Sequence, residues 1–317
     1  MTDETGLPRV LVIGETLIDV VERPGGSREE FVGGSPCNVA VGLARLGMPV
    51  ELLTSIGDDN YGNKIVEYLE RASVALVGGS QHHGRTSTAR ASLDDRGAAE
   101  YSFDIIWDLG EAGQVSEPVA VHTGSVACVL EPGATRVREE IDRLAPHATI
   151  TFDPNIRPDL MGEREDARDH VEKIVRLSDV VKVSSEDIAW LYPDQDPRTV
   201  ATQWLTRGPA VVFVTAGAKG SFGAARNAMV EFATPKVDVV DTVGAGDAFM
   251  AGIIEGLAHE GLLGVEAREH LHKIDVESLH RVGEFAAHVA GLTVAKAGAQ
   301  PPYLSQVLAS MGQGNVI

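Results

Sequence analysis

Short apolar runs alternate with segments of helical periodicity along this 317-residue chain, and this alternation restricts the fold more than any other feature of the sequence. The runs have the length of buried strands and lie at Arg9–Val20, Val50–Gly57, Ile150–Asp153, Val180–Ser184 and Val211–Thr215. Helical patterns lie between them, as at Ser35–Leu46, where apolar residues recur at helical spacing before Gly47. Strands that alternate with helices predict an α/β fold, in which helices cover both faces of a central, mostly parallel sheet.

Two stretches, at about 21–34 and 85–108, depart from this alternation. Polar and apolar residues alternate there with glycines, which is typical of exposed strands in a small antiparallel sheet. We predict that they form a β-lid over the carboxyl ends of the main strands, where α/β sheets bind ligands. No composition shift marks a linker, so residues 1–317 are expected to form one domain. Ile105, Ile106 and Trp107 are expected on exposed lid strands, which favours a homodimer formed through the lid.

Charge and hydropathy narrow the classes of partner. The formal net charge is −19, so the surface repels phosphate backbones and anionic lipids, and neither nucleic acid nor membrane is an expected partner. No apolar run reaches the roughly 18 residues of a membrane helix, and the first residues lack a signal-peptide pattern, so a cytoplasmic protein is expected. Cys37 and Cys128 form no CxxC pair, so neither a disulfide framework nor a thiolate zinc site is expected.

A glycine-rich turn before a long apolar helix, DTVGAGDAFMAGIIEGL (Asp241–Leu257), carries the strongest chemical signal. The apolar residues 237–240 are interpreted as a strand that leads into the turn. Small residues at a helix start let free backbone N–H groups approach an anion, and Asp247 stands beside them as a proton acceptor. Phosphoryl transfer needs both elements together. Taken alone, however, the pattern favours a structural interpretation, an N-cap aspartate after a glycine turn.

The complete string DTVGAGDAF resembles the C-terminal signature, DTxGAGDxF, of the ribokinase/PfkB carbohydrate kinases. The resemblance covers roughly residues 9–303, with the motifs in the family's order. It implies a ribokinase-like α/β fold and an ATP-dependent kinase that transfers the γ-phosphoryl group to a sugar hydroxyl. Asp247 would be the catalytic base, and the backbone amides of Gly244, Ala245 and Gly246 would receive the phosphoryl group.

Two other motifs resemble the family's sugar side: FVGGSPCNVAVGLARLG, and FDPNIRP at the junction of sugar and phosphate. The resemblance implies a sugar site formed by Asp19, Gly33, Gly34, Asn38, Asn155 and Arg157. Glycine admits the backbone close to a sugar ring, and asparagine both donates to and accepts from hydroxyls. Structural alternatives remain open. The GG-x3-N pattern also fits a turn with an N-cap, and Arg157 also suits a salt bridge that caps the next helix.

The nucleotide and metal segments resemble the family less closely. VKVSSEDIAWL stands where the family has N-x-x-E, so Ser184 and Asp187 replace both fixed residues. Asp187 is still expected to hold Mg²⁺ through water, since a carboxylate binds hydrated Mg²⁺. VFVTAGAKGS resembles a strand and turn that contact nucleotide phosphates, which assigns Thr215, Gly217 and Gly220, together with Ser184, to nucleotide binding.

The last helix and loop, FAAHVAGLTVAKAGAQPP, resembles the part of the family that lines adenine and a monovalent-cation site. Ala287 replaces an asparagine that many relatives carry, so one adenine contact is expected to be absent. The resemblance permits a potassium ion held by backbone carbonyls around Asp241, Val243, Thr293, Lys296 and Gly298.

The motifs GGSPCNVAVGLARLG and KVS are nearest to the fructokinase-like branch, which makes D-fructose the first expected acceptor. Ribose, 2-keto-3-deoxygluconate and nucleosides remain open as acceptors. A non-catalytic sugar or nucleotide sensor on the same fold remains a rival, because Ser184 and Asp187 depart from the family pattern. A nicotinamide dehydrogenase is rejected, because GETLID at Gly14 is not the GxGxxG that such an enzyme needs after its first strand.

Overall fold

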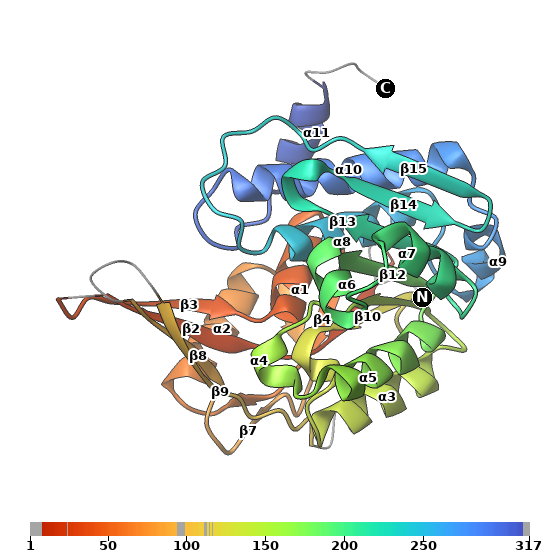
Figure 1. Ribbon diagram of the computed structural model, residues 1–317. Coiled ribbons are helices and arrows are strands. Elements are labelled where there is room, and N and C mark those ends of the chain that lie inside the picture. The colour runs from red at the N-terminus through yellow and green to blue at the C-terminus, as the bar shows by residue number, and fades with distance from the viewer. Residues whose placement is uncertain are drawn as a thin grey trace.

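A nine-stranded sheet forms the centre of the molecule in this computed structural model, which describes residues 8–23, 25–93, 99–110, 113, 115 and 117–312 (Figure 1). The strand order is β15-β14-β13-β12-β11-β10-β1-β4-β6. Its strands are β1 (Val10–Ile13), β4 (Val50–Leu53), β6 (Val74–Leu76), β10 (Ala120–Gly124), β11 (Thr149–Asp153), β12 (Val180–Ser184), β13 (Val211–Thr215), β14 (Ser221–Ala225) and β15 (Ala228–Phe232). Every neighbouring pair from β6 to β13 is parallel, and β14 and β15 complete the sheet as antiparallel strands. The predicted α/β class is confirmed.

Helices cover both faces of this sheet, each face over its own apolar core. One face carries α1 (Ser35–Arg45), α2 (Asn60–Arg71), α8 (Ala245–His259) and α10 (Val276–Val294), with the short α9 (Arg268–Leu271) and α11 (Leu304–Gly312) nearby. The other carries α3 (Gly133–Leu144), α5 (Arg164–Leu177), α6 (Ser185–Leu191) and α7 (Pro197–Leu205), with α4 (Pro158–Met161) leading into α5. Three 3₁₀ turns complete the helices: η1 (Ser125–Cys128), η2 (Gly217–Lys219) and η3 (Val265–Ala267). Alternate strand residues feed the two cores, because successive side chains point to opposite faces.

A separate four-stranded sheet projects from one side of the body (Figure 1). It consists of β3 (Arg28–Gly33), β2 (Leu17–Glu22), β8 (Thr88–Leu93) and β9 (Ala99–Asp104), in that order. Its middle pair, β2 and β8, is parallel, so this lid is mixed rather than antiparallel as expected. A two-stranded ladder of β5 (Ile56–Gly57) and β7 (Gln81–His82) is also present.

Three sequence-based expectations about strands are wrong. The run 9–20 is two strands in two different sheets, β1 and β2, separated by a polar bend at Glu15 and Thr16. Likewise, 50–57 divides into β4 and β5. Residues 237–240 form no strand. Val239 and Val240 are 64% and 63% exposed, and the Val240 N–H donates to the carbonyl of Val294 at the end of α10 (2.8 Å) instead of to a strand.

The expectation that Trp107 lies on an exposed lid strand is also wrong. The residue lies beyond the end of β9 and is 4% exposed. Its indole N–H donates to the carbonyl of Ala127 (3.0 Å), and its ring packs against Gly133, where a Cβ would come within 2.3 Å of it. Ile105 and Ile106 are half-buried. The indole therefore anchors the lid connection to the body instead of offering a surface for a second subunit.

Among the described residues, no helix combines the length and apolarity needed to span a membrane.

Candidate active site

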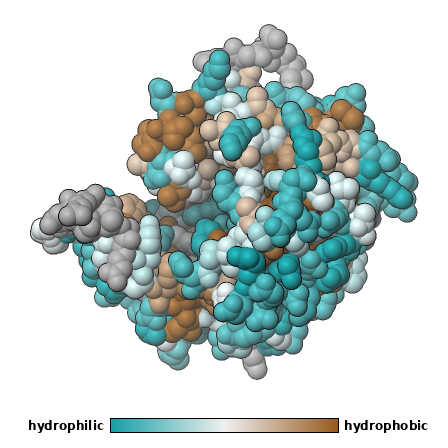
Figure 2. All heavy atoms as spheres, viewed as in Figure 1, coloured by the Kyte–Doolittle hydropathy of each residue, from teal (hydrophilic) through white to brown (hydrophobic). Residues whose placement is uncertain are grey.

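A cavity of about 370 Å³ lies between the lid and the body, where Figure 2 shows the surface hollowed beside the projecting lid. The lid contributes Asp19, Ala89 and Phe103 to its lining, and the segment around the start of α8 contributes Gly244, Gly246 and Asp247. The three lid residues share a face because Asp19 pairs in register with Ala89, and Ala89 with Phe103. One cavity thus joins residues that are more than two hundred positions apart in the chain.

The first turn of α8 forms one end of this cavity and has free donors. Gly244 precedes the helix in the left-handed region (φ 75°), and a Cβ there would lie 2.6 Å from the Cβ of Ala299, so a glycine is required. The N–H of Ala245 is bonded to the carbonyl of Thr242 (3.3 Å). Within the described residues, the N–H groups of Gly246 and Asp247 have no acceptor. These free amides and the helix dipole create a local site for an anion.

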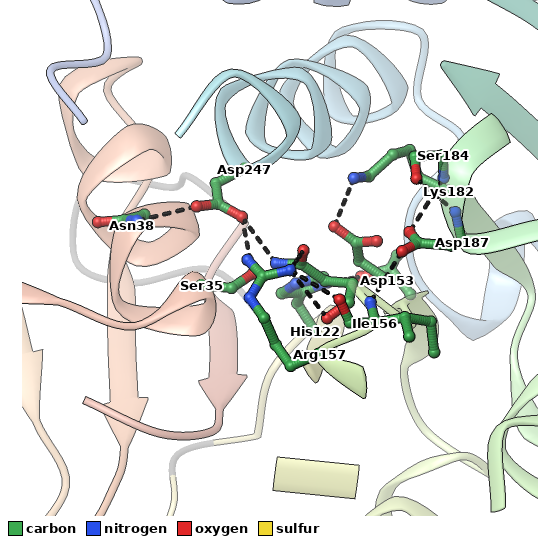
Figure 3. Close-up of polar contacts among 12 residues, drawn as sticks. Ser35, Asn38, His122, Asp153, Ile156, Arg157, Lys182, Ser184, Asp187 and Asp247 are labelled. Atoms are coloured by element: carbon green, nitrogen blue, oxygen red, sulfur yellow. Dashed lines mark hydrogen bonds and ion pairs between the residues drawn. The ribbon is translucent and has the colours of Figure 1, made fainter. Parts of the chain in front are cut away.

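Asp247 points from that turn toward the other end of the cavity, as Figure 3 shows. Its side chain is buried and accepts from three donors on other segments. Ser35 Oγ donates to Oδ1 (2.7 Å), Asn38 Nδ2 donates to Oδ2 (2.8 Å), and Asn155 Nδ2 lies 3.5 Å from Oδ1. Among the described residues Oδ2 accepts from Asn38 alone, so this oxygen can accept a further bond from an incoming hydroxyl.

The sugar-side residues predicted from the GG motif lie around Asp247. Asn38 is 8% exposed, and its Oδ1 has no donor, so it is a buried acceptor available to a ligand hydroxyl. Gly33 packs directly on Asp19, where a Cβ would come within 2.0 Å of Oδ2. Gly34 has φ 103°, and a Cβ there would lie 2.4 Å from the carbonyl of Glu15. Both glycines are therefore needed to seat β3 and α1 against the cavity floor.

Asp19 sits on β2, and burial raises the pKa of its carboxyl to about 6, although the positive charge of Arg157 opposes the rise. Arg157 lines the cavity and donates to Asn155 Oδ1 (2.7 Å) and to the carbonyl of Ile156 (3.0 Å). Among the described residues it has no acidic partner, so a salt bridge that caps α4 is not observed. Asn155 has φ 39°, a strained value for a residue with a side chain, and this strain turns it toward Asp247.

Both side-chain oxygens of Asp187, the predicted metal residue, already accept hydrogen bonds from backbone N–H groups. Ser184 and Asp187 form a capping box at the start of α6: Ser184 Oγ accepts from the Asp187 N–H (2.9 Å), and Asp187 Oδ2 accepts from the Ser184 N–H (3.3 Å). Asp187 Oδ1 accepts from the Ile156 N–H (3.0 Å). A carboxylate oxygen can accept a second bond, so a water-mediated contact to a hydrated cation still fits this residue. None of these atoms lines the cavity.

The predicted nucleotide residues follow neighbouring parallel strands. Ser184 ends β12 and pairs in register with Thr215, which ends β13. Gly217 and Gly220, with φ 54° and 96°, shape the turn between β13 and β14. These residues lie at the same carboxyl edge of the sheet as Asp153, but they do not line the cavity.

The predicted cation loops are brought together by Asp241. Its Oδ1 accepts from the Val243 N–H (3.0 Å) and its Oδ2 from the Gly298 N–H (2.8 Å), which ties the turn before α8 to the loop after α10. The carbonyl of Thr293 already accepts from the Lys296 N–H (3.1 Å). Ala287 is 6% exposed and packs in the apolar core that includes α8 and α10.

Sequence reasoning missed several polar residues at the site. Ser35 bonds the base, Glu15 lines the cavity floor, and Lys182 forms a buried ion pair with Asp153. A signal was available for two of them. Lys182 is the single charge in the apolar run 180–184, and Glu15 is one of two acids in the mostly apolar run 9–20; such charges are rarely buried unless they are paired or functional.

Comparison with known proteins decides the family. Residues 7–306 match the pfkB family of carbohydrate kinases. The chain belongs to this family. The kinase is 32% identical over 268 residues to a fructokinase of Rhizobium leguminosarum bv. trifolii, covering 80% of this chain and 81% of that protein. It is 30% identical over 302 residues to a fructokinase of Escherichia coli, covering 92% and 94%.

The solved structures agree with this assignment. The crystal structure of a fructokinase with bound ATP from Xylella fastidiosa matches the kinase with a TM-score of 0.81 at 28% identity, covering 96% of this chain and 98% of that one. The resemblance inferred from DTVGAGDAF is confirmed, and so is the ribokinase-like α/β fold of this carbohydrate kinase.

Proposed function

We propose that this kinase transfers the γ-phosphoryl group of ATP to a hydroxyl of a neutral sugar, with D-fructose as the first acceptor to test. Asp247 accepts the hydroxyl proton, the sugar oxygen bonds to the γ-phosphorus, and the bond from that phosphorus to the β,γ-bridging oxygen breaks, which releases ADP. The free amides of Gly246 and Asp247 stabilise the charge on the transferred group. The relatives from Rhizobium, Escherichia and Xylella, all fructokinases, and the ATP bound to the last of them support this choice.

The observation that carries the proposal is the position of Asp247. Its carboxylate belongs to the turn that bears the free amides, yet its hydrogen bonds go to Ser35 and Asn38 on the lid side of the same cavity. A base that spans the two ends of a cavity in this way can reach an acceptor hydroxyl at the point where the γ-phosphoryl group arrives.

The charge of the cavity separates neutral acceptors from acidic ones. Among the described residues that line it, three are acidic, Glu15, Asp19 and Asp247, and one is a cation, Arg157. Arg157 is also engaged by Asn155 and the Ile156 carbonyl. An ionised carboxylate without a cationic partner repels an anionic ligand and accepts hydrogen bonds from hydroxyls. The balance therefore favours fructose or ribose over the acid 2-keto-3-deoxygluconate.

A phosphorylation screen of the purified kinase against fructose, ribose, 2-keto-3-deoxygluconate and nucleosides tests this, with ADP release and the sugar phosphate measured together. Fructose should give the highest kcat/KM and 2-keto-3-deoxygluconate a much lower value. Asp247→Asn is the matched control, since it keeps the shape and removes the base. Higher kcat/KM for the sugar acid would contradict the charge argument. Binding of sugar and ATP without turnover would instead favour the sensor.

Mg²⁺ would arrive with the ATP phosphates and be held through water by Asp187. The metal supplies positive charge to the phosphate oxygens during transfer. The support for this role is the chemistry of the donors, since buried carboxylates of Asp153 and Asp187 lie at the same edge of the sheet. Asp187→Asn should raise the Mg²⁺ concentration needed for half-maximal activity, and an unchanged requirement would remove Asp187 from this role.

A potassium ion is proposed between the loop at Asp241–Val243 and the loop at Thr293–Gly298, held by backbone carbonyls. The support is the double bridge from Asp241 to both loops, which brings their backbones together. Replacement of potassium by a bulky organic cation at constant ionic strength should lower kcat. Equal rates in both buffers would argue against the site.

A homodimer through the lid is the last part of this proposal. The buried Trp107 does not support it. Three aromatic residues on the lid do, since Phe31, Tyr101 and Phe103 are 51%, 62% and 36% exposed. The Tyr101 and Phe103 rings stack with their centroids 6.3 Å apart. An aromatic surface of this kind is typical of an interface. Sedimentation should give a dimer that Tyr101→Asp dissociates, and a monomeric wild type would reject it.

A further inference from the structure

Lys182 and Asp153 form a buried ion pair that the catalytic scheme above does not use. Lys182 lies on β12 and Asp153 at the end of β11, and their side chains are 4% and 0% exposed. Nζ lies 2.5 Å from Oδ2, yet neither oxygen of Asp153 has a well-directed hydrogen bond. Taking two charges out of water costs several kcal/mol per ion. Replacing such a pair by apolar residues is often neutral or stabilising, so its presence asks for a functional reason.

The ammonium lies directly against the turn that bears the free amides. A Cβ built on Gly246 would come within 3.0 Å of Lys182 Nζ, and Gly246 lines the cavity. Gly246 has an ordinary helical backbone, because it is absent from the residues with positive φ. A larger residue at this position would have to displace the ammonium, which is the atom nearest to that space.

Lys182 is the positive charge in a group that otherwise consists of carboxylates and a neutral imidazole. Burial raises the pKa of Asp153 while the ammonium opposes that rise, and Asp187 and Asp247 add further negative charge nearby. Burial and the neighbouring ammonium also lower the pKa of His122 to about 3, so this imidazole is neutral. Its Nδ1 is bonded to Thr151 Oγ1 (3.0 Å). An incoming phosphate near Gly246 would meet carboxylates on one side and this ammonium on the other.

We propose that Lys182, positioned by Asp153, is part of the phosphoryl-binding site, and that its ammonium binds the γ-phosphoryl group of ATP beside the amides of Gly246 and Asp247. The inference rests on the kinase function proposed above. Lys182 takes part in no bond change and acts by its charge alone. Asp153 is a positioning residue, since it holds the ammonium against the turn while no phosphate is present.

Lys182→Met keeps most of the unbranched apolar part of the side chain and removes the ammonium. It should lower kcat by about a hundredfold or more, the size of the loss of one oxyanion-site donor, and should leave the KM for sugar nearly unchanged. Lys182→Arg should not restore full activity, because the larger guanidinium does not fit beside Gly246. A folded Lys182→Met variant with normal kcat would overturn the proposal.

A double variant distinguishes a functional ammonium from a structural partner of Asp153. Lys182→Met leaves Asp153 buried without its counter-charge, whereas Lys182→Met with Asp153→Asn removes both charges. The double variant should recover stability in urea unfolding but not kcat. Recovery of kcat along with stability would show that Lys182 only neutralises Asp153. Arg268→Met is the matched control, because Arg268 pairs with Asp179 (2.9 Å) far from the cavity, and it should lower stability without lowering kcat.

Nucleotide binding separates a failure of this inference from a failure of the proposed function. Calorimetry without sugar compares ADP with a non-hydrolysable ATP analogue, both with Mg²⁺, in wild type and in the double variant. Loss of Lys182 should reduce the preference for the triphosphate by about tenfold, as expected for one charge-assisted contact. An unchanged preference rejects the γ-phosphoryl contact even if sugars are turned over. If no sugar is turned over, the reduced preference still supports it.

The wild-type protein provides the test if neither variant folds. In protein labelled with ¹⁵N at the lysine ammonium groups, the buried Lys182 should give a resonance protected from solvent exchange. The ATP analogue should shift this resonance and ADP should not. A resonance that responds to neither nucleotide would overturn the proposal.

Discussion

The two ends of the cavity differ in their polar groups, which are side chains at one end and mainly backbone amides at the other. At the acceptor end, side chains of α1 and of the segment after β11 bond to Asp247, with Ser35, Asn38 and Asn155 as the donors. At the phosphate end, the functional groups are backbone amides and one buried ion pair, Lys182 with Asp153. The proposed acceptor end therefore depends on side chains from several segments, whereas the proposed phosphate end depends mainly on the backbone of one helix start.

This difference follows from what each ligand requires. A phosphoryl group is the same in every turnover and needs charge and donors at fixed points, which a helix start supplies without side-chain motion. A sugar must be distinguished from similar molecules by its hydroxyls, and selectivity of that kind comes from buried polar groups that are left unpaired by the wrong ligand. Substitutions at the two ends should therefore change different kinetic parameters.

The largest effect is expected at Asp247, where the two ends meet. Asp247→Asn should lower kcat by at least about a hundredfold, the ordinary size of a general-base contribution. The KM values for sugar and ATP should change little, because the amide keeps the shape and can still bond to Ser35 or Asn38. Steady-state kinetics with both substrates measure this. Near-normal kcat would remove Asp247 from the mechanism.

The next effect is on the free energy of unfolding, which the buried carboxyl group of Glu15 lowers when it is ionised. Burial raises the pKa of Glu15 from 4.5 to about 7, so the folded state binds a proton that the unfolded state releases between these values. Ionised Glu15 therefore destabilises the fold above pH 7, and the penalty disappears as the pH falls toward 4.5. Glu15→Gln should raise the free energy of unfolding by about 3 kcal/mol at pH 8 and by much less at pH 5.

Urea unfolding of wild type and Glu15→Gln at the two pH values checks this. Glu255→Gln is a useful control, since the pKa of Glu255 is also raised by burial but its helix position lies outside the cavity. An equal gain at both pH values would mean that the effect of Glu15→Gln is not the loss of a buried charge.

A smaller effect should distinguish the two ends of the cavity through the KM values for sugar and for ATP. Asp19→Ala should raise the KM for sugar by about ten- to a hundredfold, since a ligand hydroxyl is left without its acceptor, and should leave the KM for ATP unchanged. In the wild type, the sugar KM should rise as the pH falls through about 6, because Asp19 becomes protonated there. Asp19→Asn should lose that dependence. If instead the KM for ATP rises, the two ends of the cavity are reversed.

The smallest effect tests whether the departures in the metal segment are structural. Ser184→Ala removes one half of the capping box on α6 and should lower the free energy of unfolding by about 1 kcal/mol. The KM values for sugar and ATP should stay near those of the wild type. Thermal unfolding and steady-state kinetics measure both. A large rise in the KM for ATP with unchanged stability would assign Ser184 to nucleotide contact instead.

Much of the fold was predictable because its signals are local. Alternation of apolar strands and helical patterns indicates a parallel sheet whatever the detailed packing, and DTVGAGDAF marks a helix start with an acid beside it. The boundaries were less predictable. The run 9–20 is mostly apolar, and its periodicity does not reveal that β1 and β2 belong to different sheets.

The sequence by itself determined that Asp247, Gly244 and Asn38 are candidate site residues, because motif spacing and residue type are properties of the chain. Only the tertiary structure decided that Asn38 and Ser35 bond the same carboxylate, that Asp187 is held in a cap, and that Trp107 is buried. It also brought the ammonium of Lys182 to the turn at Gly246. Such contacts join segments far apart in sequence, and their distances depend on how strands and helices pack, which no local pattern encodes.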